Sequence, residues 1–335
     1  MEHLSNGQWL PLVFMALMGL AILAYVILDG YDLGTGILMS RASDAEKDRM
    51  IASIGPFWDA NETWLVLGIG ILLVAFPAAH GVILTGLYLP VALMLGGLIL
   101  RGVSFDFRAK VKEHHKHLWD KSFIAGSLIA TLAQGYMLAL YIVGFARTAS
   151  AHAFGLLVGV CLTAGYALLG ASWQIMKTEG ALQRKAVRWA RLAVWGTAAG
   201  ILAVSAATPL VSARIFEKWF SLPNFLILLP IPLLTAGLVI WLELVLKKLP
   251  LPDDRWCWVP FAGSAGLFLL GFIGLAYSFF PYIVLDRMTI WDAASAPESL
   301  LIILTGVLIV LPFIIAYTVF VYRVFWGKAS ELNYY

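Results

Sequence analysis

Residues 9–30 read WLPLVFMALMGLAILAYVILDG, a run in which the only charged side chain lies close to the end. A helix needs about 20 mostly apolar residues to cross the hydrocarbon core of a bilayer, so this stretch predicts a membrane-spanning helix. Eight further segments of similar length and polarity follow it. The nine predicted spans cover residues 9–30, 57–76, 80–104, 119–145, 152–176, 189–212, 222–246, 259–285 and 298–326.

The composition supports this interpretation and excludes a soluble protein. Of the 335 residues, 61% are hydrophobic and only 13% are charged, whereas a soluble domain is about one quarter charged. A formal net charge of +3 is too small to indicate nucleic acid as a partner, and two cysteines exclude a disulfide scaffold. Because the connecting segments are short, we predict a single all-α, polytopic membrane domain over residues 1–335.

The basic residues predict how the chain is oriented. With nine spans, successive loops alternate between the two sides of the membrane, and all but four of the 23 Lys and Arg residues fall on one side. The four exceptions are Arg147, Arg214, Lys218 and Arg287. Loops rich in Lys and Arg stay in the cytoplasm, so we expect a periplasmic N-terminus and a cytoplasmic C-terminus.

Polar side chains gather at the cytoplasmic ends of the first three predicted spans. The segments are 29–36 (DGYDLGTG), 55–64 (GPFWDANETW) and 101–108 (RGVSFDFR). An ionisable side chain inside a span is costly, so each one indicates a function by default. Asp59 and Glu62 are three residues apart and therefore share a helix face. Two such carboxylates cannot both stay ionised in lipid without a nearby cation, for which Arg101 is the candidate. A series of carboxylates leading inward from the cytoplasm is what proton uptake requires.

The same residues also have a structural explanation. The helix dipole favours Asp59 in a first turn. Asp29 and Asp32 would cap the end of the first helix at the lipid headgroups. Gly30 and Gly34, four residues apart, would allow close helix packing. The nearby arginines would then only follow the positive-inside rule.

No histidine lies in the middle of a predicted span, and the methionines within spans, Met15, Met18, Met94 and Met137, are interpreted as lipid or core contacts. Membrane cytochromes hold haem with His or Met axial ligands. The six histidines are predicted to lie outside the bilayer core, with His3, His80 and His152 at the outer surface and His114, His115 and His117 in a basic cytoplasmic loop. We therefore predict that this chain ligates no metal and no haem.

The three polar segments resemble the signatures of one family, subunit II of cytochrome bd-type quinol oxidases. Residues 29–36 resemble its D-G-[FY]-D-x-G-x-G motif, and residues 58–65 (WDANETWL) resemble W-D-[GA]-N-[EQ]-x-W-L. Residues 101–108 resemble R-x-x-[GS]-F-[DE]-[FY]-R. The motifs occur in order within the first third of the chain, while the rest matches only in its pattern of spans. The short chain length is similar to that of the cyanide-insensitive oxidase branch.

The resemblance implies a bacterial inner-membrane complex that oxidises quinol and reduces dioxygen to water. Two four-helix bundles and a peripheral ninth helix are implied for the fold. The b and d haems would belong to a partner, subunit I, and a small single-span accessory subunit, lipid and quinone would be further partners. Position by position, Asp59, Asp106 and Glu62 would belong to a proton path from the cytoplasm. The residues expected to support that path are Trp58, Asn61, Trp64 and Arg101. Four residues match the first motif without an implied role, namely Asp29, Gly30, Asp32 and Gly34.

Two alternatives remain open at this stage. A proton-coupled transporter would also place carboxylates within its spans, although no inverted repeat is evident. A purely structural subunit would use the same acids only to pair with Arg101 and Arg108.

Overall fold

The computed structural model describes residues 7–329. Within that part of the chain, nine helices are long and apolar enough to cross a membrane, when α10 and α11 are taken together. Their bounds are α1 Leu10–Leu38, α3 Trp58–Ala75, α5 Tyr88–Lys110, α6 Glu113–Ile142, α7 Ala149–Lys177, α8 Gly180–Val211, α10 Asn224–Leu228 with α11 Pro230–Leu246, α12 Val259–Phe279 and α14 Pro297–Val324. The all-α, polytopic membrane fold is therefore confirmed.

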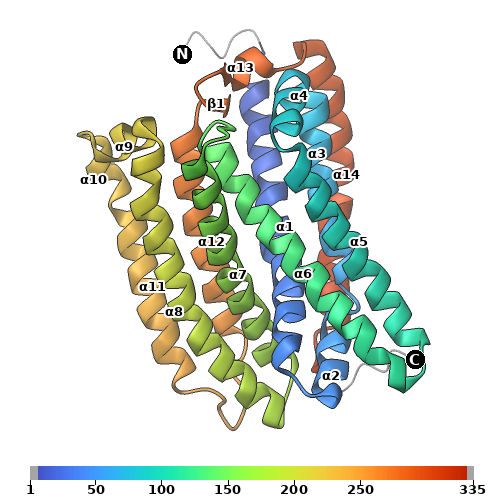
Figure 1. Cartoon of the computed structure of the whole chain (residues 1–335). Coiled ribbons are helices and arrows are strands. Elements are labelled where there is room, and N and C mark those ends of the chain that lie inside the picture. Colours follow the sequence, from blue (N-terminus) through green and yellow to red (C-terminus); the bar gives the residue numbers. More distant parts are fainter. Residues whose placement is uncertain (1–6, 330–335) are drawn as a thin grey trace.

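Short elements close the two ends of the molecule (Figure 1). At the end near the C-terminus lie the 3-10 turn η2 (Met39–Arg41) and the helix α2 (Asp44–Ile54). At the other end are α4 (Pro77–Gly86), α9 (Ala213–Phe220), α13 (Ile290–Ala293) and a small hairpin. The hairpin pairs β1 (Tyr282–Val284) with β2 (Met288–Thr289) in antiparallel fashion, with Tyr282 opposite Thr289. It is the one β-sheet in the described residues.

The first helix is longer than predicted. The predicted span covers residues 9–30, whereas α1 continues to Leu38, although glycine and aspartate disfavour helix interiors. Gly30 and Gly34 lie against Tyr166 of α7, and packing at such close range outweighs their weak helix propensity. The first motif thus lies inside the helix, and the expectation that Asp29 and Asp32 cap its end is wrong.

Other differences in the spans are explained by proline and by charged helix ends. The predicted span 80–104 is interrupted at Leu87, because Pro90 has no N–H to donate to the carbonyl of Gly86. The predicted span 259–285 ends at Phe279, just before Pro281 and the hairpin. The predicted sixth and fourth spans begin earlier, at Gly180 and Glu113, as helices extend beyond the apolar stretch.

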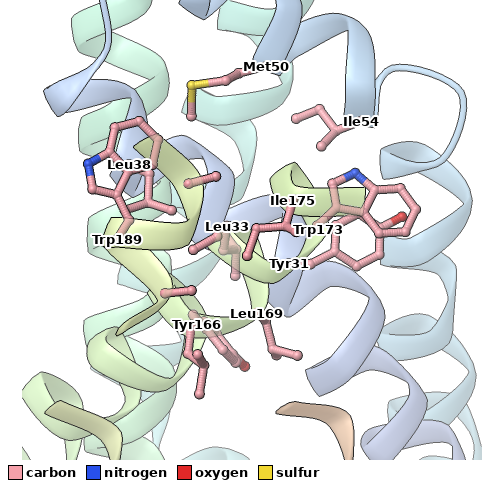
Figure 2. Close-up of a cluster of buried hydrophobic side chains, with 14 of the residues drawn as sticks. Tyr31, Leu33, Leu38, Met50, Ile54, Tyr166, Leu169, Trp173, Ile175 and Trp189 are labelled. Atoms are coloured by element: carbon pink, nitrogen blue, oxygen red, sulfur yellow. The ribbon is translucent and has the colours of Figure 1, made fainter. Parts of the chain in front are cut away.

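The core lies where α1, α6, α7 and α2 meet, toward the end of the molecule that holds the C-terminus. Tyr31 of α1 stacks on Trp173 of α7, with ring centroids 4.0 Å apart (Figure 2). Met50 and Ile54 of α2 are fully buried in the same cluster, so α2 covers this end of the helices. The core therefore surrounds the motif residues of α1.

The helix α14 packs on α1 and α3 but is mostly exposed along its length. The C-terminal end of α14 is held by hydrogen bonds from Lys177, a buried residue at the end of α7. The Lys177 ammonium donates hydrogen bonds to the carbonyl oxygens of Phe325 (2.5 Å) and Gly327 (3.1 Å). The grouping into two four-helix bundles plus a peripheral helix stays a prediction, because α7 packs on α1 and α6 as well as on α8.

Candidate functional site

Arg101 lies at the centre of the buried polar site. Its side chain is fully buried, and its Nη2 lies 2.6 Å from Asp29 Oδ1 and also bonds Glu62 Oε1. These three residues come from α5, α1 and α3, which pack so that their charged side chains converge. The Trp58 ring lies 5.9 Å from the guanidinium carbon and covers it on one side. The predicted pairing of Arg101 with Glu62 is confirmed, and Asp29 is a second partner.

Asn61 is the hub of an adjoining hydrogen-bond network. Its Nδ2 donates to Asp32 Oδ2 at 2.8 Å and lies 2.8 Å from the Tyr31 hydroxyl. The Tyr322 hydroxyl donates to Asn61 Oδ1 at 3.1 Å and is 2.8 Å from the Tyr31 hydroxyl. Asp32 and Asn61 are almost completely buried. The network therefore places Asp32 inside the protein with three polar neighbours from α1, α3 and α14.

A further polar group lies deeper along the helices. The Gln134 amide of α6 donates to the Tyr25 hydroxyl, and the Tyr166 hydroxyl of α7 donates to Gln134 Oε1, both at 2.7 Å. Tyr25 is one helical turn from Asp29, so this group continues inward from the ionic site. Trp64 packs against Tyr25 and closes the site on the α3 side.

The charges of the buried site do not balance. The three carboxyl groups of Asp29, Asp32 and Glu62 surround a single guanidinium, and several of the polar atoms are not hydrogen-bonded. Among the described residues, no hydrogen-bond partner is found for Asp29 Oδ2, Asp32 Oδ1, Arg101 Nε and Arg101 Nη1. Buried polar atoms are rarely left without partners, so these atoms suit bound protons and water.

The structure brings only part of the predicted proton path together. Glu62 is half-buried on the Arg101 guanidinium, whereas Asp59 and Asp106 are exposed on the surfaces of α3 and α5. Neither exposed carboxylate forms an ion pair with another residue between 7 and 329. The Trp58 ring, which covers the Arg101 guanidinium, lies 4.9 Å from the Phe105 ring of α5. The exposed acids therefore lie at the edge of the site, and the buried acids are those of the first motif.

The glycines of the first motif have a packing role, as the structural explanation expected. A Cβ atom on Gly30 would lie 2.9 Å from the Tyr166 ring, and one on Gly34 would overlap the Tyr166 carbonyl oxygen. The absence of side chains lets α1 and α7 approach closely. This contact holds Asp29 and Asp32 in fixed positions between helices.

A cluster of ion pairs encloses the site at the end of the molecule that holds α2. Arg108 bonds Asp120 (2.6 Å) and Asp48 of α2 (2.8 Å), and Lys185 of α8 bonds Glu46 of α2 (2.7 Å). Arg108 is nearly buried, so it is more than a surface charge. These pairs hold α2 across the end of the helices, next to the buried acids.

Several site residues were missed by the sequence analysis. Gln134 is the one with a usable signal, because an amide inside an apolar span is unusual. Tyr31 lies within a quoted motif but was not singled out. Tyr322 has no local signal, since it is 261 positions from Asn61 and meets it only through the fold.

Among residues 7–329, each histidine lies in a short helix or near the start of a long one, away from the middle of the spanning helices. The histidines of the described part are on α4, at the start of α6 and at the start of α7, where His152 bonds the Tyr136 hydroxyl. His3 lies outside the described residues. No group of three or more His, Cys, Asp or Glu among residues 7–329 is arranged to hold a metal ion. No step of the mechanism is therefore assigned to a haem on this chain.

The family model for cytochrome bd terminal oxidase subunit II matches residues 10–325, nearly the whole of the described chain. The chain belongs to this family. The subunit II is 26% identical over 370 residues to cytochrome bd-I ubiquinol oxidase subunit 2 of Escherichia coli K12, covering 96% of each chain. It is 28% identical to cytochrome bd ubiquinol oxidase subunit 2 of Bacillus subtilis 168, covering 97% of each. Family membership decides against the transporter alternative.

The fold of this subunit II is also found in a solved structure. It matches a chain of the bd oxidase from Geobacillus thermodenitrificans with a TM-score of 0.77 and 15% identity, covering 94% of this chain and 98% of that one. At this identity the likeness concerns the fold, and it agrees with the arrangement of nine apolar helices.

Proposed function

We propose that this subunit II ligates no haem and works beside a haem-bearing subunit I in a complex that oxidises quinol and reduces dioxygen to water. The relatives named as ubiquinol oxidase subunits support this assignment. The b and d haems of the complex are assigned to subunit I. Those haems supply the electron transfer and oxygen chemistry, and the residues of this chain supply structure and proton handling.

The observation that carries the proton-handling role is the excess of buried carboxyl groups around Arg101. Taking an unpaired carboxylate out of water is costly, so three acids beside one guanidinium favour retention of a proton within the group. Glu62 is bonded to Arg101 at its Oε1 and is half-exposed, so it can exchange protons with the surface. Asp29 and Asp32, which are fully buried, then serve as internal acceptors.

The proposed path begins at the exposed carboxylates of Asp59 and Asp106. It continues to Glu62, while Arg101 stabilises whichever carboxyl group is ionised at a given moment. Asn61, Trp58 and Trp64 are positioning residues that hold the acids and limit access of lipid. Asp59 and Asp106 are exposed when this chain is considered without a partner. Subunit I and bound water therefore complete the path.

We assign the chain to the bacterial inner membrane with its N-terminus in the periplasm. Four basic residues lie in loops and short elements at the end that holds α9 and the hairpin. They are the four exceptions to the charge bias, Arg147, Arg214, Lys218 and Arg287. The remaining Lys and Arg residues favour the cytoplasm for the opposite end. The path then opens to the cytoplasm. The small single-span accessory subunit, lipid and quinone remain proposed partners on the strength of the family resemblance.

Turnover and proton uptake of the assembled complex test the proposal. We expect Glu62→Gln and Asp106→Asn to slow oxygen consumption and the proton uptake that follows an oxygen pulse, while the haem spectrum stays unchanged. Glu179→Gln, which removes an exposed cytoplasmic acid away from the site, is the matched control. If fully assembled Glu62→Gln and Asp106→Asn complexes showed unchanged turnover and proton uptake, these acids would have a purely structural role.

A further inference from the structure

The helix α9 at the periplasmic end presents its side chains in an unusual way. Phe216 and Phe220 are 48% and 55% exposed and lie ring to ring at 5.0 Å, while the cationic side chains of Arg214 and Lys218 are partly buried toward α12 and the hairpin. A helix in water would turn its charges outward. The exposed phenylalanines indicate that α9 lies in the membrane interface, with its cations between itself and the body of the protein.

The two cations are only partly neutralised by this chain. Lys218 Nζ bonds the Phe280 carbonyl oxygen and lies 4.8 Å from the centre of the Tyr277 ring, and neither group is anionic. Arg214 Nη1 donates to Asp286 Oδ1 at 3.0 Å, and that carboxylate is itself well exposed. Burial, and Arg214 nearby, lower the pKa of the Lys218 ammonium, so an added anion would favour its charged form.

An apolar groove begins below this pair of cations. It has a volume of about 360 Å³ and lies between α11 and α12, lined by Leu233, Leu234, Gly237, Leu238, Trp241 and Leu270. From Leu233 to Trp241 it extends for about 12 Å at the helical rise of about 1.5 Å per residue. Its lining has the length and the apolar character that suit a hydrocarbon chain.

The groove and the cations lie along one face of α12, with Trp219 of α9 packed between them. Leu270, Gly274 and Tyr277 follow each other at helical spacing and therefore share a face. The Trp219 ring of α9 lies against Gly274, and its Nε1 donates to Ser278 Oγ at 2.7 Å. Lys218 therefore stands two helical turns above the groove, on the periplasmic side.

We propose that this surface binds one anionic phospholipid of the periplasmic leaflet, with its phosphate at Lys218 and Arg214 and one acyl chain in the groove. The charge of the headgroup complements the incompletely paired cations. The apolar lining suits the chain, and the position of α9 places both at the correct depth. The site is separate from the buried acids, which lie toward the opposite end of the helices.

Lipid binding to the purified, delipidated oxidase complex tests this site. Native mass spectrometry would compare dioleoyl phosphatidylglycerol with dioleoyl phosphatidylcholine, which has the same chains and no net charge. We expect preferential retention of phosphatidylglycerol, weakened about fivefold by Lys218→Gln, as the attraction of one basic side chain to an anionic headgroup implies. Arg147→Gln, which removes an exposed periplasmic cation elsewhere, is the control and should leave retention unchanged.

A second pair of variants tests the groove. A Cβ atom on Gly237 would meet no atom within 4 Å, so Gly237→Leu fills the groove without a clash and should also reduce retention. Gly271→Leu adds the same side chain at an equally open position of α12 outside the lining and should have no effect. Equal retention of the two lipids would overturn the proposal, as would retention unaffected by both Lys218→Gln and Gly237→Leu.

Discussion

Gly34 of α1 and Gly170 of α7 meet backbone to backbone. A Cβ atom on Gly34 would lie 3.0 Å from the Gly170 amide nitrogen and only 1.8 Å from the Tyr166 carbonyl oxygen. A Cβ atom on Gly170 would lie 2.4 Å from the Gly34 carbonyl carbon. No side chain of either residue could be accommodated by a change of rotamer, because the atoms in the way belong to the main chain.

Gly34→Ala should therefore force α1 and α7 apart and disturb the buried acids between them. Overpacking a core costs about 1–3 kcal/mol, and contact with rigid backbone places this site at the upper end or beyond. The measurement is the thermal unfolding midpoint and yield of the purified complex. Gly70→Ala of α3, where a Cβ atom meets nothing within 4 Å, is the matched control and should behave as wild type.

Replacing Arg101 with methionine should destabilise the complex strongly, because Asp29 and Glu62 would lose their buried cation. Breaking such a buried pair from one side costs about 3–5 kcal/mol. The double variant with Asp29→Asn should recover part of the loss, since one unpaired acid is removed with its partner. Thermal unfolding of the four proteins in the cycle checks this expectation.

The same substitution at an exposed pair provides the comparison. Arg255 is 76% exposed and pairs with Asp253, so Arg255→Met should cost less than about 1 kcal/mol. If Arg101→Met were no more harmful than Arg255→Met, the ionic site would contribute nothing to the stability of the fold.

Tyr322→Phe should remove the hydrogen bonds to Tyr31 and Asn61 while keeping the ring contact with Phe57, at 4.6 Å between centroids. A hydrogen bond of this kind contributes about 1 kcal/mol, so a modest fall in the unfolding midpoint is expected. Tyr317→Phe, on the exposed side of the same helix, should show no fall. Equal midpoints for the two variants would mean that the hydroxyl network does not fasten α14.

The stability supplied by Glu46 should depend on pH. Partial burial raises the pKa of the Glu46 carboxyl. Hydrogen bonds from Lys185 and from the Ser43 backbone outweigh this effect and lower the pKa below its usual range. A lowered pKa in the folded state means that the contribution is present above the ordinary pKa of Glu and is lost as the pH falls through the lowered value. The Glu46 side chain is 19% exposed and that of Lys185 is 26% exposed, so water still screens the pair and the contribution is about 1 kcal/mol.

Unfolding of wild type and Glu46→Gln at two pH values measures this dependence. The difference between their midpoints should be present at pH 7.5 and should disappear under acid conditions in which Glu46 is protonated. A difference that persists in acid would mean that Glu46 acts through packing of α2 instead of through its charge.

The number of spans and their polarity could be predicted from the sequence because each membrane helix corresponds to one continuous apolar stretch. The positions at which helices end were less accessible. Residues 30 to 38 contain three glycines and an aspartate, and their helical conformation depends on α7, which is 130 positions away. Pro90 and Pro281 were visible, and their effects on helix ends follow from the missing N–H.

The candidate site was found in part. The three motif segments do converge, and Arg101 meets Glu62 as charge considerations suggested. Asp29 matched the first motif without an implied role, and the structural explanation placed it at the headgroups, away from Arg101. Tyr322 and Tyr166 could not be found, since each joins the site through packing between distant helices and carries no local mark.

Lys177 of α7 depends on α14 for its hydrogen-bond acceptors. The Lys177 ammonium is buried, and no carboxylate of the described residues pairs with it, so it depends on the carbonyl oxygens of Phe325 and Gly327. Those residues follow α14, 148 and 150 positions after Lys177. Until α14 packs against the other helices, the buried ammonium of α7 lacks its hydrogen-bond acceptors, so the docking of this mostly exposed helix completes the packing of α7.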